Sequence, residues 1–341
     1  MLAFVTSARF ADHRLPGSLP EAGHPERPDR LRAIHAAVRQ AGMVGAGEGL
    51  ADLVLHFDIP GSGPPMAVLT PQEPAGDETL GLVHPPEYIR FIGDLAHSGG
   101  GYADEGETYA GPESDAVARL AVAAALRAAD VVMDGSARRS FAAVRPPGHH
   151  ALADRAMGFC IYANAAIAAR HLQRKHGLSR VAIVDFDVHH GNGTQAIFWR
   201  DPSVLNVSLH QDPRTLWPGS GFAGETGEDA GRGCTLNVPL PPGTGDERFL
   251  AALNELVLDR VAGFAPEAIV VSAGFDAHAS DPLAQLELSS DAFGRIGATL
   301  ARLAEDVCDG RLIAQLEGGY DLRALGQSVT AFLRGLAPPT A

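Results

Sequence analysis

The chain has 341 residues, of which 45% are hydrophobic and 20% are charged, and its formal net charge at pH 7 is −14. This balance is typical of a soluble globular protein, and so acidic a chain argues against direct nucleic-acid binding, which needs clustered Lys and Arg. No apolar run approaches the ~20 residues of a membrane-spanning helix, and the N-terminus lacks a secretory pattern, so we expect a cytoplasmic protein without a membrane partner. The negative charge favours approach by cationic substrates, although many cytosolic enzymes are acidic for solubility alone.

Short apolar runs rich in Val and Ile alternate with longer Ala- and Leu-rich stretches of helical period. In chain order the predicted elements are a strand at 2–6, a helix at 28–41, a helix at 115–134, a strand at 141–144, a helix at 162–176, a strand at 181–185, a helix at 193–199, strands at 204–209 and 235–238, a helix at 247–264, a strand at 268–272, a helix at 291–307, a strand at 312–316 and a helix at 322–336. Gly42 and Gly177 stand where glycine ends a helix, and Ser114 and Ser290 where a side chain caps a helix start.

The alternation of strands with helices predicts one α/β domain with a mostly parallel, doubly wound sheet. Strands as continuously apolar as VAIVDF and AIVVSAG need a sheet that is covered on both faces. Segments 62–79 and 98–112 are expected to be long surface loops, and no repeat or interdomain linker divides the chain. The three cysteines, Cys160, Cys234 and Cys308, are scattered and odd in number, which favours a reducing compartment and a packing role.

Polar side chains follow five of the predicted strands at the point where each strand ends. Because ligands bind beyond the carboxyl ends of parallel strands, we expect these side chains to meet at one edge of the sheet. They are His149 and His150, Asp185, Asp187 and His189, His210, Asp276, and Tyr320.

Asp187 and His189 are two residues apart, so in extended backbone their side chains leave on the same face. Asp276 from another strand completes a set of one imidazole and two carboxylates. Three protein ligands with one position left for water are typical of catalytic zinc, although oxygen-rich ligation also suits Mn²⁺ or Fe²⁺.

The tandem His149 and His150 can supply acid–base chemistry at neutral pH. Asp185 and Asn192 are the candidate partners, one anionic and one neutral, and would give the two histidines different proton affinities. Tyr320 follows two glycines that let the backbone turn, and its hydroxyl could donate to a developing oxyanion.

Six motifs together resemble the histone deacetylase family, which includes acetylpolyamine amidohydrolases and acetoin-utilisation proteins. They are RPPGHH at 145–150, GFCIYANAAIAARH at 158–171, DFDVHHGNGTQ at 185–195, VSLH at 207–210, GFDAH at 274–278 and EGGY at 317–320. The similarity extends from HPERPDRL at 24–31 to the tyrosine of EGGY. It implies a single catalytic domain over 1–341, with an eight-stranded, mostly parallel sheet and helices on both faces, as in the arginase/deacetylase-like fold.

The resemblance also implies roles for individual residues. Asp187, His189 and Asp276 match the zinc ligands, and His150 matches the general base and acid. Asn192 stands at the partner position of His150, where an amide is the pattern of the class II-like branch. His149, paired with Asp185, resembles the electrostatic helper, and Tyr320 the phenol that polarises the scissile carbonyl.

For the substrate, Gly158 and Phe159 resemble one wall of an acyl-lysine tunnel. Trp217 stands where the opposite wall usually has phenylalanine. Leu283 occupies a position that is acidic in a polyamine-specialised branch, and Ser114 lies near a position that contacts the substrate amide in class II enzymes.

The family also binds a structural potassium ion, largely through backbone carbonyls. The matching positions are Asp185, Asp187, His189, Ser208 and Leu209. A second monovalent-ion site would lie around Phe198 and Val204, whereas His190 is expected to be structural.

These implications predict a zinc-dependent amidohydrolase that removes acetyl or other short acyl groups from N-acyl-lysine or related amines. Acetylpolyamine deacetylation is the alternative, since the loop with Asp104, Glu105 and Glu107 could attract a polyamine. The preferred interpretation of these three residues is an ordinary solvated loop. A binuclear-manganese ureohydrolase and a non-catalytic acyl-binding protein are two further, less favoured hypotheses for the function. The substrate would be a small acylated amine or an acyl-lysine protein, and the sequence leaves open whether the chain forms a homo-oligomer.

Overall fold

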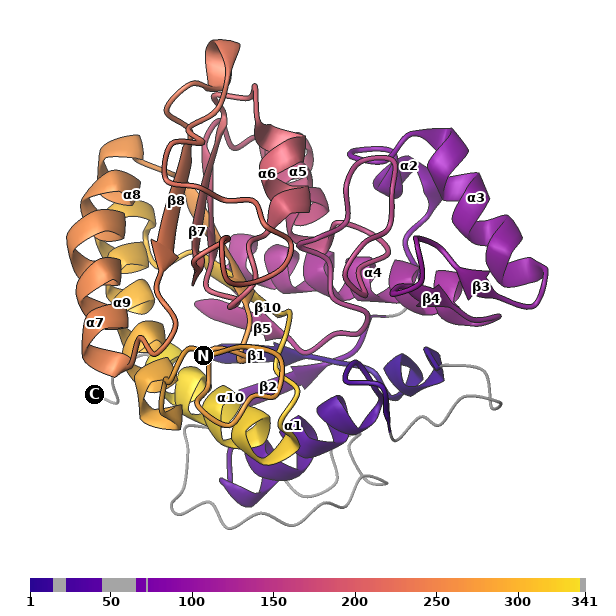
Figure 1. Ribbon diagram of the computed structural model, residues 1–341, viewed down its shortest axis with the longest axis horizontal. Helices are drawn as coiled ribbons and strands as arrows, with labels where there is room; N and C mark the ends of the chain where they lie inside the picture. The colour runs from indigo at the N-terminus through magenta and orange to yellow at the C-terminus, as the bar shows by residue number, and fades with distance from the viewer. Residues whose placement is uncertain (15–22, 45–65, 72, 338–341) are drawn as a thin grey trace.

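The computed structural model describes residues 1–14, 23–44, 66–71 and 73–337 (Figure 1). Its centre is an eight-stranded sheet in the order β2-β1-β5-β10-β9-β6-β7-β8, in which all neighbouring strands are parallel. The strands are β1 (Leu2–Val5), β2 (Met66–Leu69), β5 (Arg139–Ala142), β6 (Val181–Asp185), β7 (Val204–Gln211), β8 (Thr235–Leu240), β9 (Ala268–Ala273) and β10 (Leu312–Leu316). The predicted fold class is confirmed.

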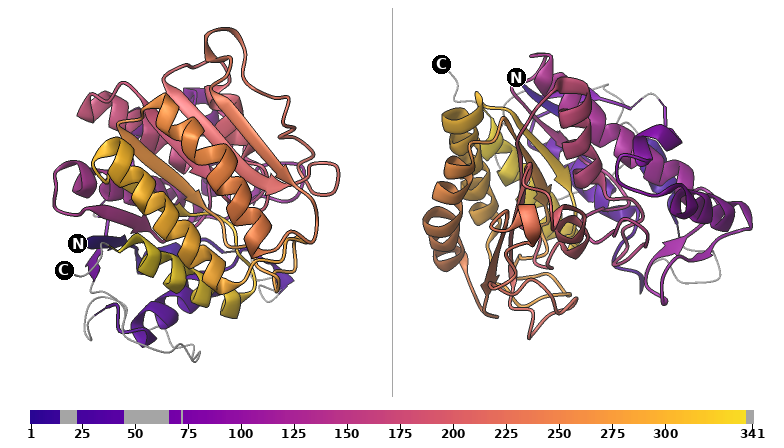
Figure 2. Two further views of the ribbon diagram at one scale, coloured as in Figure 1. Left: turned by 90° about the vertical axis from the view of Figure 1, so that its left-hand side faces the viewer. Right: turned by 90° about the horizontal axis from the view of Figure 1, so that it is seen from above.

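Helices cover both faces of this sheet (Figures 1 and 2). One layer is built from α1 (Asp29–Gln40), α7 (Asp246–Ala252), α8 (Leu258–Phe264), α9 (Ser290–Cys308) and α10 (Leu322–Leu336). The other contains α4 (Ser114–Met133), α5 (Asn164–His176) and α6 (Asn192–Phe198), with α2 (Asp77–Leu80) and α3 (Pro86–His97) beside it. Every residue of β6 and β9 is buried, as their continuously apolar sequences predict.

The predicted elements lie within two residues of observed ones, but two of the predicted caps are wrong. Helix α9 is capped by Ser289, whose side chain accepts from the Ala292 amide, so Ser290 is already inside the helix. Ser114 is likewise the first residue of α4. Gly177 does end α5 in the left-handed conformation, as predicted.

Some elements carry too little sequence signal to be predicted. Edge strand β2 has four residues and lies in the segment expected to be a loop, of which 62–65 and 72 are outside the described residues. The other expected loop contains a short hairpin of β3 (Gly101–Tyr102) and β4 (Tyr109–Ala110). The predicted helix at 247–264 is interrupted by a π-helical turn, η4 (Leu253–Val257), between α7 and α8.

No helix among the described residues is both long enough and apolar enough to span a membrane. The cysteines are free thiols, and Cys160 and Cys308 are buried, which agrees with a packing role. Because the strands are parallel, their carboxyl ends lie along one edge, where the predicted polar residues gather.

Candidate active site

Asp187, His189 and Asp276 converge at the carboxyl edge of the sheet, after strands β6 and β9. The Nδ1 atom of His189 lies 3.2 Å from Asp187 Oδ1 and 3.2 Å from Asp276 Oδ2. Both carboxylates are fully buried. Three ligand atoms, one from each residue, lie within 4.8 Å of one another.

Backbone amides fix the orientation of both carboxylates. The Gly318 amide donates to Asp187 Oδ2 over 2.7 Å, and the Val188 amide donates to Asp276 Oδ1 over 2.9 Å. Glycine is needed at 318, because a Cβ there would collide with Asp276 Oδ2. The oxygen of each carboxylate that faces His189 is therefore held in place before any ion binds.

This donor set fits a divalent metal ion. Two carboxylates buried side by side are costly unless a cation compensates them. Two oxygens and one imidazole nitrogen, with space for a further ligand, suit catalytic zinc, and the oxygen-rich set is also compatible with Mn²⁺ or Fe²⁺.

His149 and His150 lie beside this trio, with ring centroids 3.9 Å apart and ring planes tilted by 43°. The Nδ1 atom of His149 donates to Asp185 Oδ2 over 2.9 Å, whereas that of His150 donates to the Asn192 amide oxygen over 2.7 Å. Burial alone would lower the pKa of His149, but Asp187 and Asp185 more than offset it and raise that pKa. Burial and the neighbouring His149 lower the pKa of His150 well below its ordinary value. The two adjacent imidazoles therefore differ in proton affinity, as their predicted partners require.

Glu317, for which the sequence predicts no role, holds the histidine turn in place. Its Oε2 accepts from the amides of Gly148 (2.7 Å) and His149 (3.1 Å), and its Oε1 accepts from Ser272 and Gln315. A charged residue at the end of a buried strand is a signal that could have identified it.

Tyr320 is positioned by two further residues that were not predicted. Its backbone amide donates to Asp281 Oδ2 over 2.7 Å, and the Leu283 amide donates to Asp281 Oδ1 over 3.0 Å. The Arg30 guanidinium lies 4.9 Å from the centre of the Tyr320 ring and donates to the Gly319 carbonyl over 2.7 Å. Burial raises the pKa of Tyr320 well above its ordinary value, so its phenol stays protonated and can donate a hydrogen bond.

A cavity of about 420 Å³ leads to these groups. It is lined by His24, Pro25, Tyr102, Gly106, Glu107, His150, Gly158, Phe159, His189, Leu216, Trp217, Leu283 and Tyr320. Gly158 and Phe159 both have positive φ, and a Cβ on Gly158 would lie 2.5 Å from the His150 ring and 2.6 Å from Trp217. The predicted wall residues Gly158, Phe159, Trp217 and Leu283 are thus brought together around one cavity.

Ser114 is the predicted site residue that the structure places elsewhere. It is buried at the start of α4, where its hydroxyl accepts from the Gly111 amide and lies 2.7 Å from His13 Nδ1. It is not among the residues that line the cavity.

Other residues with predicted roles do not line the cavity. His190 turns away to Ser220 (2.9 Å) and Gln195 (3.0 Å), which agrees with a structural role. Asp185 and Ser208 are register partners in β6 and β7, so the segments expected to hold potassium are adjacent. Phe198 ends α6 and Val204 begins β7.

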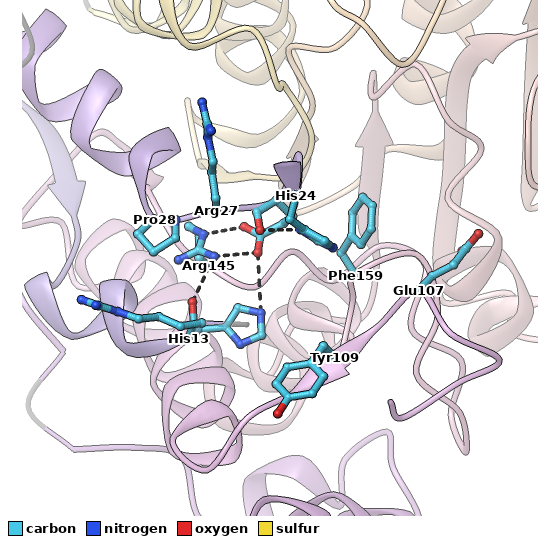
Figure 3. A pocket seen from close by; sticks show the side chains of 10 residues that line it. His13, His24, Arg27, Pro28, Glu107, Tyr109, Arg145 and Phe159 are labelled. Atoms are coloured by element: carbon cyan, nitrogen blue, oxygen red, sulfur yellow. Dashed lines mark hydrogen bonds and ion pairs between the residues drawn. The ribbon is translucent and has the colours of Figure 1, made fainter. Parts of the chain in front are cut away.

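A second, smaller pocket lies next to the cavity, and His24 and Phe159 line both (Figure 3). Among the residues that line it, Arg145 and Glu26 form a buried ion pair in which Arg145 Nη2 donates to Glu26 Oε2 over 2.7 Å. Arg30 approaches the same carboxylate at 3.3 Å. This network connects the N-terminal segment to the turns that carry the histidine pair and Tyr320.

Replacing Glu26 by glutamine is expected to lower the free energy of unfolding by about 3–5 kcal/mol, because two buried guanidinium groups would lose their counter-charge. Burial alone would raise the pKa of Glu26, but Arg145 and Arg30 help to lower it to about 2. The stabilisation is therefore complete above the unfolded pKa of ~4.5 and is lost as the pH falls towards 2. Urea unfolding at several pH values measures it.

The matched control is Glu87→Gln, which removes an exposed carboxylate 3.6 Å from Arg90 on α3. It should change the stability by less than about 1 kcal/mol. Equal effects of the two substitutions at pH 7 would contradict a stabilising role for the buried network.

Comparison with known proteins matches this chain to one family. Residues 24–336 match the histone deacetylase domain. The histone deacetylase-like amidohydrolase of Pseudomonas aeruginosa is 42% identical over 299 residues, which cover 88% of this chain and 73% of that protein. Human polyamine deacetylase HDAC10 is 37% identical over 332 residues, which cover 92% of this chain but 45% of that protein.

The crystal structure of the HDA15 HD domain shares the fold. It aligns with a TM-score of 0.84 at 35% identity, covering 97% of this chain and 87% of that one. Together with the domain match over most of the sequence, this shows that the chain belongs to the histone deacetylase family.

Proposed function

We propose that the protein is a zinc-dependent deacetylase that removes acetyl or another short acyl group from N-acyl-lysine or a related acylated amine. The observation that carries this proposal is the convergence of Asp187, His189 and Asp276 with the paired His149 and His150 beside one cavity. A metal site alone would fit many hydrolases. The adjacent histidines with unlike partners add the means to move protons during amide cleavage.

The chain's own residues divide the reaction between them. A zinc ion held by the trio would supply Lewis-acid chemistry that activates the attacking water and the acyl carbonyl. With its Nδ1 committed to Asn192, His150 has Nε2 left to accept the proton of the water and to return it to the departing amine. His149 and Asp185 stabilise the charge that develops beside it.

Replacing Tyr320 by phenylalanine is expected to lower kcat by about 10²–10³, because one hydrogen-bond donor to the developing oxyanion is lost. KM should change much less, and the fold should be unaffected, since the Asp281 contact uses the backbone of residue 320. Steady-state kinetics on an acetyl-lysine peptide measure both constants. Near wild-type turnover would contradict the assignment.

The cavity walls favour an acyl-lysine substrate. Phe159, Trp217 and Leu283 supply apolar surface along which an uncharged aliphatic chain can lie. An acetylated polyamine is the second candidate, since Glu107 lines the same cavity and could bind an ammonium group. The similarity to a polyamine deacetylase is consistent with this second reading.

The direct test compares rates on an acetyl-lysine peptide and on acetylated polyamines, with the zinc-loaded protein. We expect kcat/KM to be higher for the peptide. A higher value for the polyamines would reverse the substrate assignment but leave the amidohydrolase assignment intact. Absence of turnover on all of them by zinc-loaded protein would instead favour a non-catalytic acyl-binding protein.

Replacing Leu283 by glutamate should shift preference towards acetylated polyamines by about tenfold or more, since one charge-assisted contact contributes about 1.5–3 kcal/mol. The measured quantity is the ratio of kcat/KM for acetylspermidine to that for the acetyl-lysine peptide. Leu283→Gln is the neutral control of similar size and should move the ratio much less. An unchanged ratio in both variants would show that residue 283 does not face the substrate amine.

We also propose a structural potassium ion beside the zinc, held mainly by backbone carbonyls of Asp185, Asp187, His189, Ser208 and Leu209. The parallel pairing of β6 with β7, which sets Asp185 opposite Ser208, supports this placement. Potassium would stabilise the turn that carries the metal ligands.

A further inference from the structure

Asp130, His171 and His176 form a compact cluster on the helical layer of α4 and α5. Asp130 lies in the last turn of α4, and both histidines lie in the second half of α5. The Nε2 atoms of His171 and His176 each lie 2.8 Å from the same atom, Asp130 Oδ1. Three ligand atoms of the cluster lie within 4.8 Å of one another, as in the catalytic trio.

This cluster is separate from the catalytic centre. Helix α5 begins at Asn164, whose side chain donates to the Pro146 carbonyl beside the catalytic histidines, and it ends at His176, shortly before β6 begins at Val181. His171 and His176 lie in its second half, about two and about three turns beyond Asn164. Asp130 and His171 line a surface cavity of about 580 Å³ that none of the catalytic residues touches.

The donor set has the chemistry of a transition-metal site. Two imidazole nitrogens and one carboxylate oxygen suit Zn²⁺, Co²⁺ or Ni²⁺, whose bonds to such ligands are about 2.0–2.2 Å long. Ligand atoms in a tetrahedral site of that size are roughly 3.3 Å apart, so the 2.8 Å contacts need to open by only about half an ångström.

Exposure and outer contacts also suit an ion that enters from solvent. The side chains of Asp130, His171 and His176 are 23%, 14% and 19% exposed, so an ion can reach them and keep a water ligand. Lys175 binds the other carboxylate oxygen, Oδ2, at 2.8 Å. It therefore orients the carboxylate and leaves Oδ1 directed at the two imidazoles, as outer contacts of metal ligands do.

We propose that Asp130, His171 and His176 form a second metal site that binds a divalent transition-metal ion, with Zn²⁺ as the reference ion. The alternative is that both imidazoles only donate hydrogen bonds to the carboxylate. Counting bound metal separates the two, because hydrogen-bonded side chains alone bind no ion.

The test is calorimetric titration of chelator-treated, metal-free protein with Zn²⁺. The wild type should bind two ions per chain, and His171→Gln, His176→Gln and Asp130→Asn should each bind one. His189→Ala, which removes a ligand of the catalytic trio, should also bind one, and His176→Gln combined with His189→Ala should bind none. His97→Gln, at an exposed histidine on α3, is the matched control and should still bind two.

The second site is overturned if the wild type binds one ion and His176→Gln does not change that number. It is also overturned if His171→Gln and His176→Gln both still bind two. A different pattern is expected if the catalytic trio binds no zinc. The wild type would then bind one ion, His176→Gln would bind none, and His189→Ala would still bind one. Circular dichroism identifies any variant that fails to fold. If one of the three cluster variants fails, either of the other two provides the same test.

Zn²⁺ should also raise the thermal-unfolding midpoint of His189→Ala, and His176→Gln in that background should remove the rise. In the otherwise wild-type chain, His176→Gln should leave turnover of an acetyl-lysine peptide unchanged within twofold. A large loss of turnover with zinc bound at the catalytic trio would show that the cluster acts on the catalytic site instead.

Discussion

Removing the metal from the Asp187, His189 and Asp276 trio is expected to reduce deacetylation below detection. Without the ion, the Lewis acidity that it supplies is lost, and two buried carboxylates lose the cation that compensates them. Dialysis against a chelator should abolish turnover, and added Zn²⁺ should restore it. His189→Ala should give the same loss, and added Zn²⁺ should not restore it.

His190→Gln is the matched control in the same loop. Its ring contacts Ser220 and Gln195 and not the trio, so this variant should keep both the metal and most of the activity. Full turnover by thoroughly chelated protein would contradict a metal-dependent mechanism. If Fe²⁺ restored a higher rate than Zn²⁺, the assignment of the metal site would stand, but Fe²⁺ would replace Zn²⁺ as the assigned native ion.

The sequence predicts the part of the site that lies at strand ends. Asp187, His189, Asp276 and Tyr320 each follow a strongly apolar run, and parallel strands bring such positions to one edge whatever the intervening loops do. The two-residue spacing of Asp187 and His189 adds local geometry that needs no tertiary information. The structure brings these residues together for that reason.

Residues whose role depends on contacts between distant segments could not be predicted. Glu26, Arg30 and Arg145 form one buried network although 119 residues separate Glu26 from Arg145. Asp281 connects two loops through backbone amides, which the sequence of those loops does not reveal. The contact between Ser114 and His13 also joins segments 101 residues apart, and the sequence alone does not indicate it.

Replacing His150 by glutamine is expected to lower kcat by about 10²–10⁴, because the imidazole that takes and returns the proton is lost. Glutamine keeps a polar group near Asn192, and zinc binding should persist, since His150 is not one of the three ligands. Rates on an acetyl-lysine peptide, measured together with zinc content, separate this loss from loss of the metal. Loss of zinc in this variant would mean that residue 150 supports the metal site instead.

Asn192→Asp tests the same histidine without removing it. A carboxylate in place of the amide should stabilise the imidazolium of His150 and raise its pKa. A base with a raised pKa is inactivated by protonation at a higher pH, so the acidic limb of the kcat/KM profile should move to higher pH. A profile that does not move, together with full activity of His150→Gln, would transfer the proton-handling role to His149. A shift of the acidic limb at unchanged zinc content would show that this limb reports the protonation of His150 and depends on the neutral amide of Asn192.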